Sequence, residues 1–198
     1  VYDVCAEMKD KDITSYVVVD EKNIEFQNKY KEVANVLTAN LYFIAGLTHA
    51  KKIAKWVEEY NIKILNCHSG HAMLLCMLVK KMTEVKLVIF KHNALPSKHD
   101  LYHRFQRKFV DAFICVSRLV YKLQTETLSD FEKRKYYLVY NGINTKRFNK
   151  YKDSIFEHND KYIIGYAGRI ASDKGIDIII RALAILKCKY NDLYLYIA

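Results

Sequence analysis

Two cationic residues flank a predicted strand-to-helix turn near the end of the 198-residue chain. An apolar run leads into Gly168 and Arg169, and Lys174 follows just before Gly175 opens an amphipathic helix, all within the segment YIIGYAGRIASDKGIDIIIRAL. Helix N-termini present free N–H groups and a positive dipole, so they favour an anion, and Gly168 would let the backbone approach it closely. We therefore predict a diphosphate site at Arg169 and Lys174, with a solvated basic turn as the alternative.

Polar residues also follow several predicted strands. His68 comes after one apolar run, His92 and Asn93 after the next, and Asn141 after a later one, accompanied by Asn66, Ser69, Ser117 and Gly142. Because parallel strands end along one edge of a sheet, we predict that these residues converge on one cleft. For each histidine alone a hydrogen-bonded structural role is the alternative, and Asn141 with the following glycine also fits a hairpin turn.

Strands and helices that alternate along the chain would hold these residues in position, and the sequence shows such an alternation. Short segments that are apolar on both faces are typical of central parallel strands, and they occur at 16–19, 62–67, 85–90, 112–116, 137–140, 162–167 and 193–197. Helical periodicity occurs between them, at 48–57, 71–82, 98–109 and 175–187. Alternating strands and helices predict an α/β fold, a Rossmann-like parallel sheet with flanking helices.

A polar stretch interrupts this pattern and predicts a domain boundary. Asn149–Lys161 has weak periodicity, and a new strand, turn and helix begin after it. We expect one domain over residues 1–150, a linker over 151–161 and the start of a second domain over 162–198. The chain begins with Val1 and stops directly after an apolar run, so we expect a fragment.

Composition narrows the class of partner. Lys and Arg number 32 against 22 Asp and Glu, a net charge of +10, which favours anionic partners.

A hydrophobic content of 51% excludes intrinsic disorder. Five Cys without a CxxC pair are expected to be reduced core residues of a cytosolic protein. The apolar stretch 72–79 is too short to cross a membrane, and the acidic N-terminal segment is unlike an export signal.

Three patterns that could mimic metal sites are better explained as structure. Asp10 and Asp12 form a DxD that follows a helix-like stretch, which predicts a solvated loop. His99 and His103 are spaced like the ligands of HExxH but lack its glutamate base. A cluster of Cys67, His68 and His71 has no partner cluster with ligand spacing. We expect no metal.

A basic segment interleaved with aromatic residues predicts a contact with anionic lipid. Its cations are Lys98, Arg104, Arg107 and Lys108. Such amphipathic segments commonly lie on anionic head groups. The alternative is that Leu101, Phe105 and Phe109 pack on the sheet while the cations are solvated.

The order of these motifs resembles the retaining GT-B glycosyltransferases of family 4, from about Tyr2 to the end of the chain. The motifs that carry the resemblance are HSGH, KHN, CVS, VYNGINTKRF and GYAGRIASDKGIDIIIRAL. The resemblance implies an acceptor-binding first domain and a nucleotide-sugar-binding second domain. It implies transfer of a sugar with retention to a glycan or lipid-linked acceptor, in cell-envelope polysaccharide or glycolipid synthesis. The expected location is cytoplasmic, peripheral on the inner membrane face.

The resemblance also implies residue roles. Arg169 and Lys174 match the pair that grips the donor diphosphate, and Gly168 matches the glycine of close approach. His92 matches the histidine at the reaction centre, where it would position and polarise rather than attack, and His68 lines the cleft. Asn141 matches the segment before the interdomain crossover. No metal or other cofactor is implied.

Other motifs of the family are absent from the chain. These are its first strand with a Gly-rich loop and its paired glutamates, so we expect the chain itself to lack most of the donor pocket and to be inactive. The competing hypothesis is a non-enzymatic basic α/β module that binds nucleic acid or another polyanion. No RNA-binding motif supports it, and we expect no nucleic acid.

Overall fold

The computed structural model describes residues 1–41, 46–145 and 162–198 and divides into two compact units. Unit 1 is Val1–Asn144 and unit 2 is Thr145–Ala198. The linker expected at 151–161 lies outside the described residues, so the domain boundaries stay a prediction. Both units are built from parallel strands and helices, which confirms the α/β fold class.

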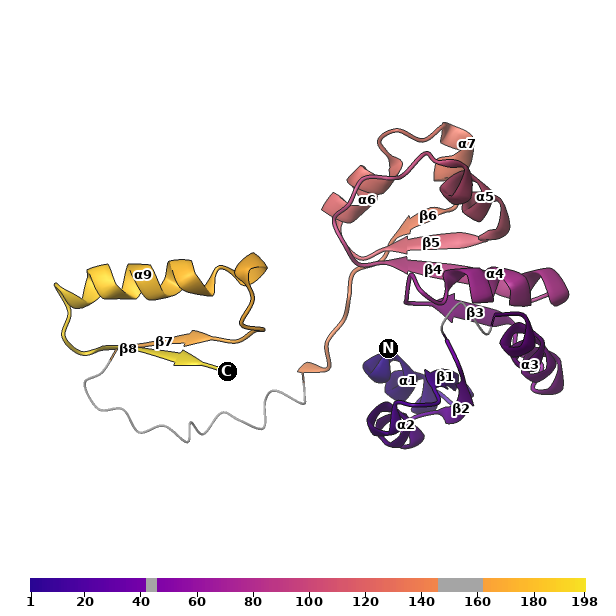
Figure 1. Cartoon of the computed structure of the whole chain (residues 1–198), viewed down its shortest axis with the longest axis horizontal. Coiled ribbons are helices and arrows are strands. Elements are labelled where there is room, and N and C mark those ends of the chain that lie inside the picture. Colours follow the sequence, from indigo (N-terminus) through magenta and orange to yellow (C-terminus); the bar gives the residue numbers. More distant parts are fainter. Residues whose placement is uncertain (42–45, 146–161) are drawn as a thin grey trace. The chain divides into compact units, whose positions relative to one another are not determined.

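Unit 1 contains two parallel sheets (Figure 1). The smaller sheet pairs β1 with β2, and the larger has the order β3-β4-β5-β6. Asn66 pairs with Val88, and Ile89 pairs with Phe113, so the strands run in one direction and their carboxyl ends share one edge. The strands are β1 (Tyr16–Asp20), β2 (Asn35–Ala39), β3 (Ile64–Cys67), β4 (Lys86–Lys91), β5 (Ala112–Cys115) and β6 (Tyr136–Leu138).

Helices connect these strands, and side-chain caps fix where some of them begin. Asp100 accepts a hydrogen bond from the His103 N–H at the start of α5, and Ser117 accepts one from the Val120 N–H at the start of α6. Such caps satisfy N–H groups that the first turn leaves free. The helices are α1 (Tyr2–Lys9), α2 (Ile24–Lys31), α3 (Gly46–Glu59), α4 (Met73–Met82), α5 (Leu101–Phe109), α6 (Arg118–Thr125) and α7 (Asp130–Lys133).

Helix α4 connects the two buried clusters of unit 1. Met77 belongs to the cluster that contains Phe113 of the larger sheet. Val79 belongs to the cluster formed with α3 and with Ala39 of β2. The expectation that this segment is buried, because it is apolar nearly all round, is confirmed. Since it packs on two sides, α4 supports the sheet edge from which the polar loops emerge.

Unit 2 is a parallel strand pair with a helical crossover (Figure 1). It consists of β7 (Tyr162–Tyr166), the short 3-10 helix η2 (Ser172–Lys174), α9 (Ile176–Lys187) and β8 (Leu193–Ile197). Strands β7 and β8 pair from Tyr162 with Leu193 to Tyr166 with Ile197. Parallel neighbours require such a crossover, and α9 provides it.

The predicted alternation of elements is confirmed, and the differences lie at boundaries and in polar segments. The helix expected from 98 begins at Leu101 because Asp100 caps it, and the helix expected from 71 begins at Met73. The sequence prediction missed β2, α2, α6 and α7, which are all eight residues or shorter and so show little periodicity. Within the described residues, no helix combines the length and apolar character that a membrane crossing requires.

Candidate functional site

The polar residues that follow the strands of the larger sheet do gather at its carboxyl edge. Strand β3 ends at Cys67, which pairs with Ile89, so β4 extends beyond it to Lys91. His68 therefore leaves the sheet beside the end of β4. His92 and Asn93 follow β4 directly. The parallel register thus brings together residues that are more than twenty positions apart in the sequence.

Three aromatic rings stack at this edge. The His68 ring centroid lies 4.5 Å from that of Phe90 and 5.9 Å from that of His92. Burial against the protein lowers the pKa of His68 to about 4, with smaller contributions from nearby positive charges that include His92. Because this pKa lies below 7, the His68 ring is neutral at pH 7.

The stacked histidines line a cavity of about 360 Å³ within unit 1. Its wall comes from the loop after β3, the end of β4 with its following loop, and the inner side of α5. Among the described residues that line it there is no Asp or Glu. The lining includes His68, Phe90, Lys91, His92, Asn93, Lys98, Tyr102, His103, Gln106, Arg107 and Phe113. The volume lies in the range of small-molecule sites.

Lys91 is a lining residue that the sequence analysis did not single out. It alternates with Leu87 and Ile89 on β4 and therefore lies on the core face of the sheet. Its ammonium lies 5.4 Å from the centroid of the Phe113 ring. The sequence signal for Lys91 is the alternation along β4: Leu87 and Ile89 are apolar, and Lys91 stands at the next position of the same face, where a third apolar residue is expected.

The structure corrects the expected role of Arg107. We predicted an exposed cation on a lipid-facing segment, but Arg107 is 8% exposed and lines the cavity. Its Nε donates to Glu132 Oε1 at 2.9 Å, and its Nη1 donates to the Lys98 carbonyl oxygen at 2.9 Å. The reason is that α5 buries the face that carries Gln106 and Arg107, and Glu132 pairs with the guanidinium there.

The other cations of this segment, Lys98, Arg104 and Lys108, are exposed. Leu101 is 83% exposed and Phe105 is 51% exposed, so the alternative that both pack on the sheet is wrong. Phe109 does pack against the core cluster. Helix α5 therefore has an inner face toward the cavity and an outer face that combines apolar and cationic side chains.

The remaining predicted residues of this edge have separate positions. Asn141 follows β6 in an exposed segment and is not among the residues that line the cavity. Ser117 caps α6. His99 Nε2 lies 2.7 Å from Thr127 Oγ1, whereas His103 Nδ1 lies 2.7 Å from Asp100 Oδ2. The two histidines thus have different partners, and no group of three or more His, Cys, Asp or Glu in the described part of the chain is arranged to hold a metal.

The cysteines confirm the expected core role except at one position. Cys5, Cys67, Cys76 and Cys115 are buried thiols, whereas Cys188 is exposed. A hydrogen bond from the Cys76 thiol lowers the pKa of Cys67, and the same bond raises that of Cys76. Cys67 also donates to the Ser69 carbonyl oxygen at 3.2 Å. These bonds hold the loop that carries His68.

Unit 2 presents its cations on an exposed turn between β7 and α9. The Arg169 and Lys174 side chains are 79% and 46% exposed, and both approach the same carboxylate. Asp173 Oδ2 lies 3.2 Å from Lys174 Nζ and 3.9 Å from Arg169 Nη2. The turn therefore brings both charges to one anionic oxygen, and a phosphate oxygen can accept the same charge-assisted hydrogen bonds as that carboxylate.

Two glycines shape this turn. Gly175 has φ of +65°, a left-handed conformation that glycine adopts without strain, and no side chain caps the helix that follows it. The Gly168 N–H donates to the Ala198 carbonyl oxygen at 3.0 Å. A Cβ at Gly168 would lie 3.1 Å from Tyr166 Oη, closer than side chains normally pack. Both positions therefore favour glycine.

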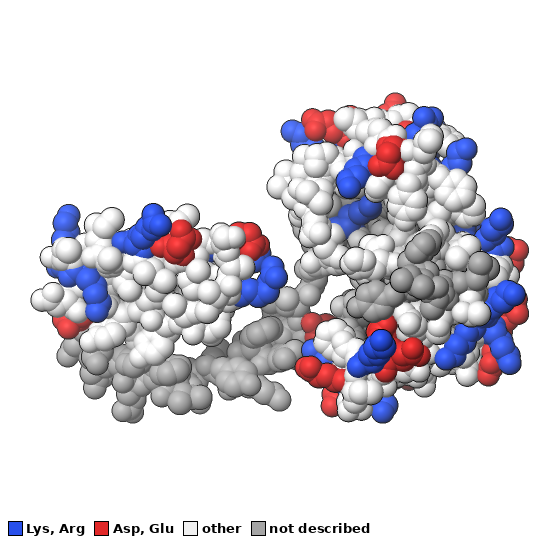
Figure 2. All heavy atoms as spheres, in the orientation of Figure 1, with Lys and Arg blue, Asp and Glu red and all other residues white. Residues whose placement is uncertain are grey.

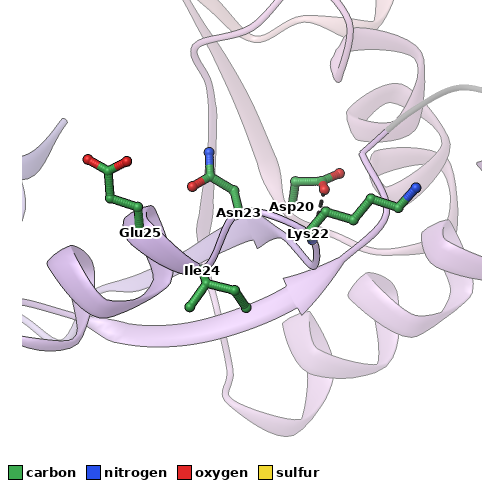
Figure 3. Close-up of a pocket in the computed structure, with 5 residues that line it drawn as sticks. All are labelled: Asp20, Lys22, Asn23, Ile24 and Glu25. Atoms are coloured by element: carbon green, nitrogen blue, oxygen red, sulfur yellow. Dashed lines mark hydrogen bonds between the residues drawn. The ribbon is translucent and has the colours of Figure 1, made fainter.

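A second hollow, of about 390 Å³, lies at the turn between β1 and α2 (Figure 3). Asp20 accepts a hydrogen bond from the Lys22 N–H at 3.0 Å, and Asn23 accepts one from the Phe26 N–H. In Figure 3 the Lys22 and Glu25 side chains extend in opposite directions. Its polar groups thus serve the turn itself, and we assign it no ligand.

The side of the molecule shown in Figure 2 carries no continuous basic face among the described residues. On the side shown in Figure 2, Lys and Arg groups are separated by acidic and uncharged surface. Broad polyanion binding depends on a basic patch or stripe. This view therefore gives no support to the competing hypothesis of a nucleic-acid-binding module.

Comparisons with solved structures show the fold. A glycosyltransferase from Rickettsia africae ESF-5 has a TM-score of 0.74 and 19% identity, over 98% of this chain and 54% of that one. Anabaena Alr3699/HepE in complex with UDP and glucose has a TM-score of 0.60 and 14% identity, over 91% of this chain and 52% of that one. Acinetobacter baumannii MurG has a TM-score of 0.60 and 5% identity, over 99% of this chain and 61% of that one.

These likenesses identify the fold as the GT-B type, and the chain spans little more than half the length of the proteins it resembles. A comparison with curated proteins finds no match. A family model for Glycosyltransferase Family 4 matches residues 1–147, which include the cavity and the stacked histidines. The match extends over most of the chain, and the chain therefore belongs to Glycosyltransferase Family 4.

Proposed function

We propose that the protein containing this chain transfers a sugar, with retention, from a nucleotide-sugar donor to a hydroxyl of a glycan or lipid-linked acceptor. The observation that carries the proposal is the convergence of Arg169 and Lys174 on one carboxylate oxygen at the start of α9. Family membership supports the transferase class. The UDP and glucose in the Anabaena structure support a nucleotide-sugar donor.

The donor diphosphate would replace Asp173 as the partner of the two cations. Cleavage of the bond between the sugar and the diphosphate leaves negative charge on the diphosphate. Fixed cations stabilise that charge more as it develops, which lowers the barrier. The proposal gives this role to Arg169 and Lys174 and includes no metal ion.

His92 would hold the acceptor hydroxyl at the edge of the larger sheet. The hydroxyl oxygen forms the new bond to the anomeric carbon while the bond from that carbon to the diphosphate breaks, and the hydroxyl proton leaves on the departing phosphate. The neutral ring of His68 stacks beside His92 and can accept or donate one hydrogen bond without adding charge. Asn93 lines the same cavity and offers an amide for sugar hydroxyls.

We further propose that the outer face of α5 contacts an anionic membrane, which would place the enzyme peripherally on the cytoplasmic face. The supporting feature is the combination of exposed Leu101 and Phe105 with exposed Arg104 and Lys108. In sedimentation with vesicles that contain an anionic phospholipid, we expect binding that Arg104→Ser with Lys108→Ser reduces severalfold. Equal binding of both forms would contradict the proposal, and exposed Lys122→Ser on α6 is the control.

The transferase proposal is tested by product analysis. The protein is incubated with α-configured UDP-, GDP- and ADP-sugars and with a lipid extract, and the nucleoside diphosphate and the glycoside are measured. We expect release of one nucleoside diphosphate and a product whose anomeric configuration, read by NMR, matches the donor. An inverted product would contradict retention. Failure of every donor to release its diphosphate would contradict the donor class.

A further inference from the structure

The cavity of unit 1 carries positive charge without a matching acidic lining. The described residues that line it include three cations and no carboxylate, the cations being Lys91, Lys98 and Arg107. Asp100 pairs with His103, and Glu132 pairs with Arg107, so these carboxylates neutralise individual lining residues from outside the cavity. In the described part of the chain, no carboxylate lies within ion-pair distance of Lys91.

Lys91 is a lining cation that has no anionic partner among the described residues. Its side chain is mostly buried, and no hydrogen-bond acceptor or carboxylate among the described residues binds its ammonium. The contact it makes is with the Phe113 ring, 5.4 Å from the ring centroid. Burial lowers the pKa of Lys91, which is the direction expected for a cation that lacks a partner. A buried ammonium is costly unless it is paired, so an anion in the cavity would stabilise it.

Arg107 provides a rigid second cation. Glu132 and the Lys98 carbonyl oxygen hold its Nε and Nη1, each at 2.9 Å, from the side away from the sheet. These bonds fix the guanidinium plane, so little conformational entropy would be lost when a ligand binds to it. Arg107 lines the same cavity as Lys91, which makes both cations available to one ligand there.

The cationic lining adjoins the histidines that the proposed transfer uses. Lys91 is the last residue of β4, and His92 follows it directly. Both line the same cavity, together with His68. A ligand whose anionic group contacts Lys91 would therefore extend its neighbouring hydroxyls toward the histidines.

We propose that this cavity binds an anionic group of the sugar acceptor, a phosphate or a carboxylate, with Lys91 and Arg107 as its ligands. The inference rests on the proposed function, because it specifies the chemical class of the acceptor. The anionic group belongs either to a lipid-linked acceptor or to a soluble acidic sugar. These sources share the same chemistry at Lys91, and the experiment distinguishes them.

The test is binding to the 198-residue chain, measured by calorimetry or NMR, and needs no turnover. Four probes form two pairs: glucose 1-phosphate with methyl glucoside, and a polyprenyl phosphate with the polyprenol in the same detergent micelles. We expect the phosphorylated member of at least one pair to bind at least tenfold more tightly. Selective binding in the lipid pair alone identifies a lipid-linked acceptor, and selective binding of the sugar phosphate identifies a soluble one. Equal binding within both pairs overturns the proposal.

Lys91→Met removes the charge while keeping an unbranched chain beside Phe113. Loss of a charge-assisted contact is expected to weaken binding of the phosphorylated probe roughly 10- to 100-fold. Lys86→Met is the matched control, because Lys86 lies on the same strand with its side chain 69% exposed. Lys91→Arg should retain most of the binding. Unchanged binding by Lys91→Met overturns the proposal.

A measurement on the unmodified chain keeps the proposal testable if Lys91→Met does not fold. A brief pulse of an amine-acetylating reagent is followed by peptide analysis, with and without the phosphorylated probe. We expect the probe to slow acetylation of Lys91 severalfold and to leave Lys86 unaffected. Equal acetylation of Lys91 in both samples overturns the proposal. Failure of the transferase proposal alone would leave this protection intact, so the two outcomes are distinguishable.

Discussion

The two units present their cations in opposite ways. In unit 2, Arg169 and Lys174 are exposed on one short turn and approach a single carboxylate oxygen. In unit 1, Lys91 and Arg107 come from a strand end and a helix and line a cavity. Exposed charges are screened by water and salt, whereas charges in a cavity are screened much less.

Because of this difference, we expect the two sites to bind different classes of ligand. The exposed turn suits a diphosphate, whose charge is large enough to compete with solvent and with Asp173. The cavity suits a ligand with a single anionic group and a matching shape. The proposals therefore assign donor binding and acceptor binding to structurally unlike sites, and the following predictions test each assignment.

The largest effect is expected on the stability of unit 1. Phe113 is 1% exposed and packs in the main buried cluster. Phe113→Ala leaves a cavity there and should lower the free energy of unfolding of unit 1 by about 3–5 kcal/mol. Urea unfolding monitored by NMR signals of unit 1 measures it. Ile178→Ala, at a position in unit 2 that is 67% exposed, should change stability by less than about 0.5 kcal/mol. Equal losses of unfolding free energy in the two variants would contradict the assignment of Phe113 to a buried core and of Ile178 to the surface.

A slightly smaller effect is expected on donor use in unit 2. In the full-length protein that contains this chain, Arg169→Ala and Lys174→Ala should each lower kcat/KM for the nucleotide-sugar by roughly 10²- to 10³-fold, the scale for losing one preorganised group that stabilises developing charge. Arg181→Ala is the control, because Arg181 is exposed later in the same helix α9. Full activity in both turn variants would exclude the diphosphate assignment.

In the full-length protein that contains this chain, His92→Ala tests the acceptor side and should lower kcat roughly 10²-fold or more, as expected for loss of one positioned polar or proton-transfer group. The fold should stay intact, because His92 is exposed beyond the end of β4. His71→Ala changes an exposed histidine of the loop after β3 that does not line the cavity, and it should retain activity. Similar kcat values for both variants would assign His92 a merely structural role.

The smallest effect concerns acid stability at the far end of the same sheet. Burial alone would raise the pKa of Asp111, but hydrogen bonds from Lys80 and from the Leu87 N–H, with the charges of Lys80 and Lys86, lower it below its ordinary value. Ionised Asp111 therefore stabilises the fold above pH 4, and this contribution is lost as the pH falls through the lowered pKa.

Asp111→Asn should thus cost a few tenths to about 1 kcal/mol at pH 7, since the pair is partly exposed. The difference from the unmodified chain should shrink near pH 3. Urea unfolding at the two pH values measures both quantities. An equal difference at pH 7 and pH 3 would show that the ion pair does not carry the effect.

The two sites also differ in how far sequence predicts them. The turn of unit 2 is local: Gly168, Arg169 and Lys174 lie within seven consecutive residues, so spacing alone indicates their proximity. His68 and His92 were predicted to meet because parallel strands end at one edge, and their stacked rings confirm it.

Lys91 and Arg107 were not predicted to line a site. Their position depends on which face of β4 and which face of α5 are buried, and both are set by tertiary packing. Asn141 was predicted to lie with the strand-end residues, but it does not line the cavity. A position after a strand does not by itself ensure that a side chain lines the cavity. The roles of all these residues stay predictions until they are measured.

The most direct test of the donor assignment is an NMR titration of the 198-residue chain with UDP, GDP and ADP at millimolar concentrations. All three share the diphosphate, so at least one should shift the amide signals of Gly168, Arg169 and the first turn of α9, and Arg169→Ala with Lys174→Ala should abolish those shifts. Shifts of the same size in the double variant, or shifts confined to unit 1, would contradict the account.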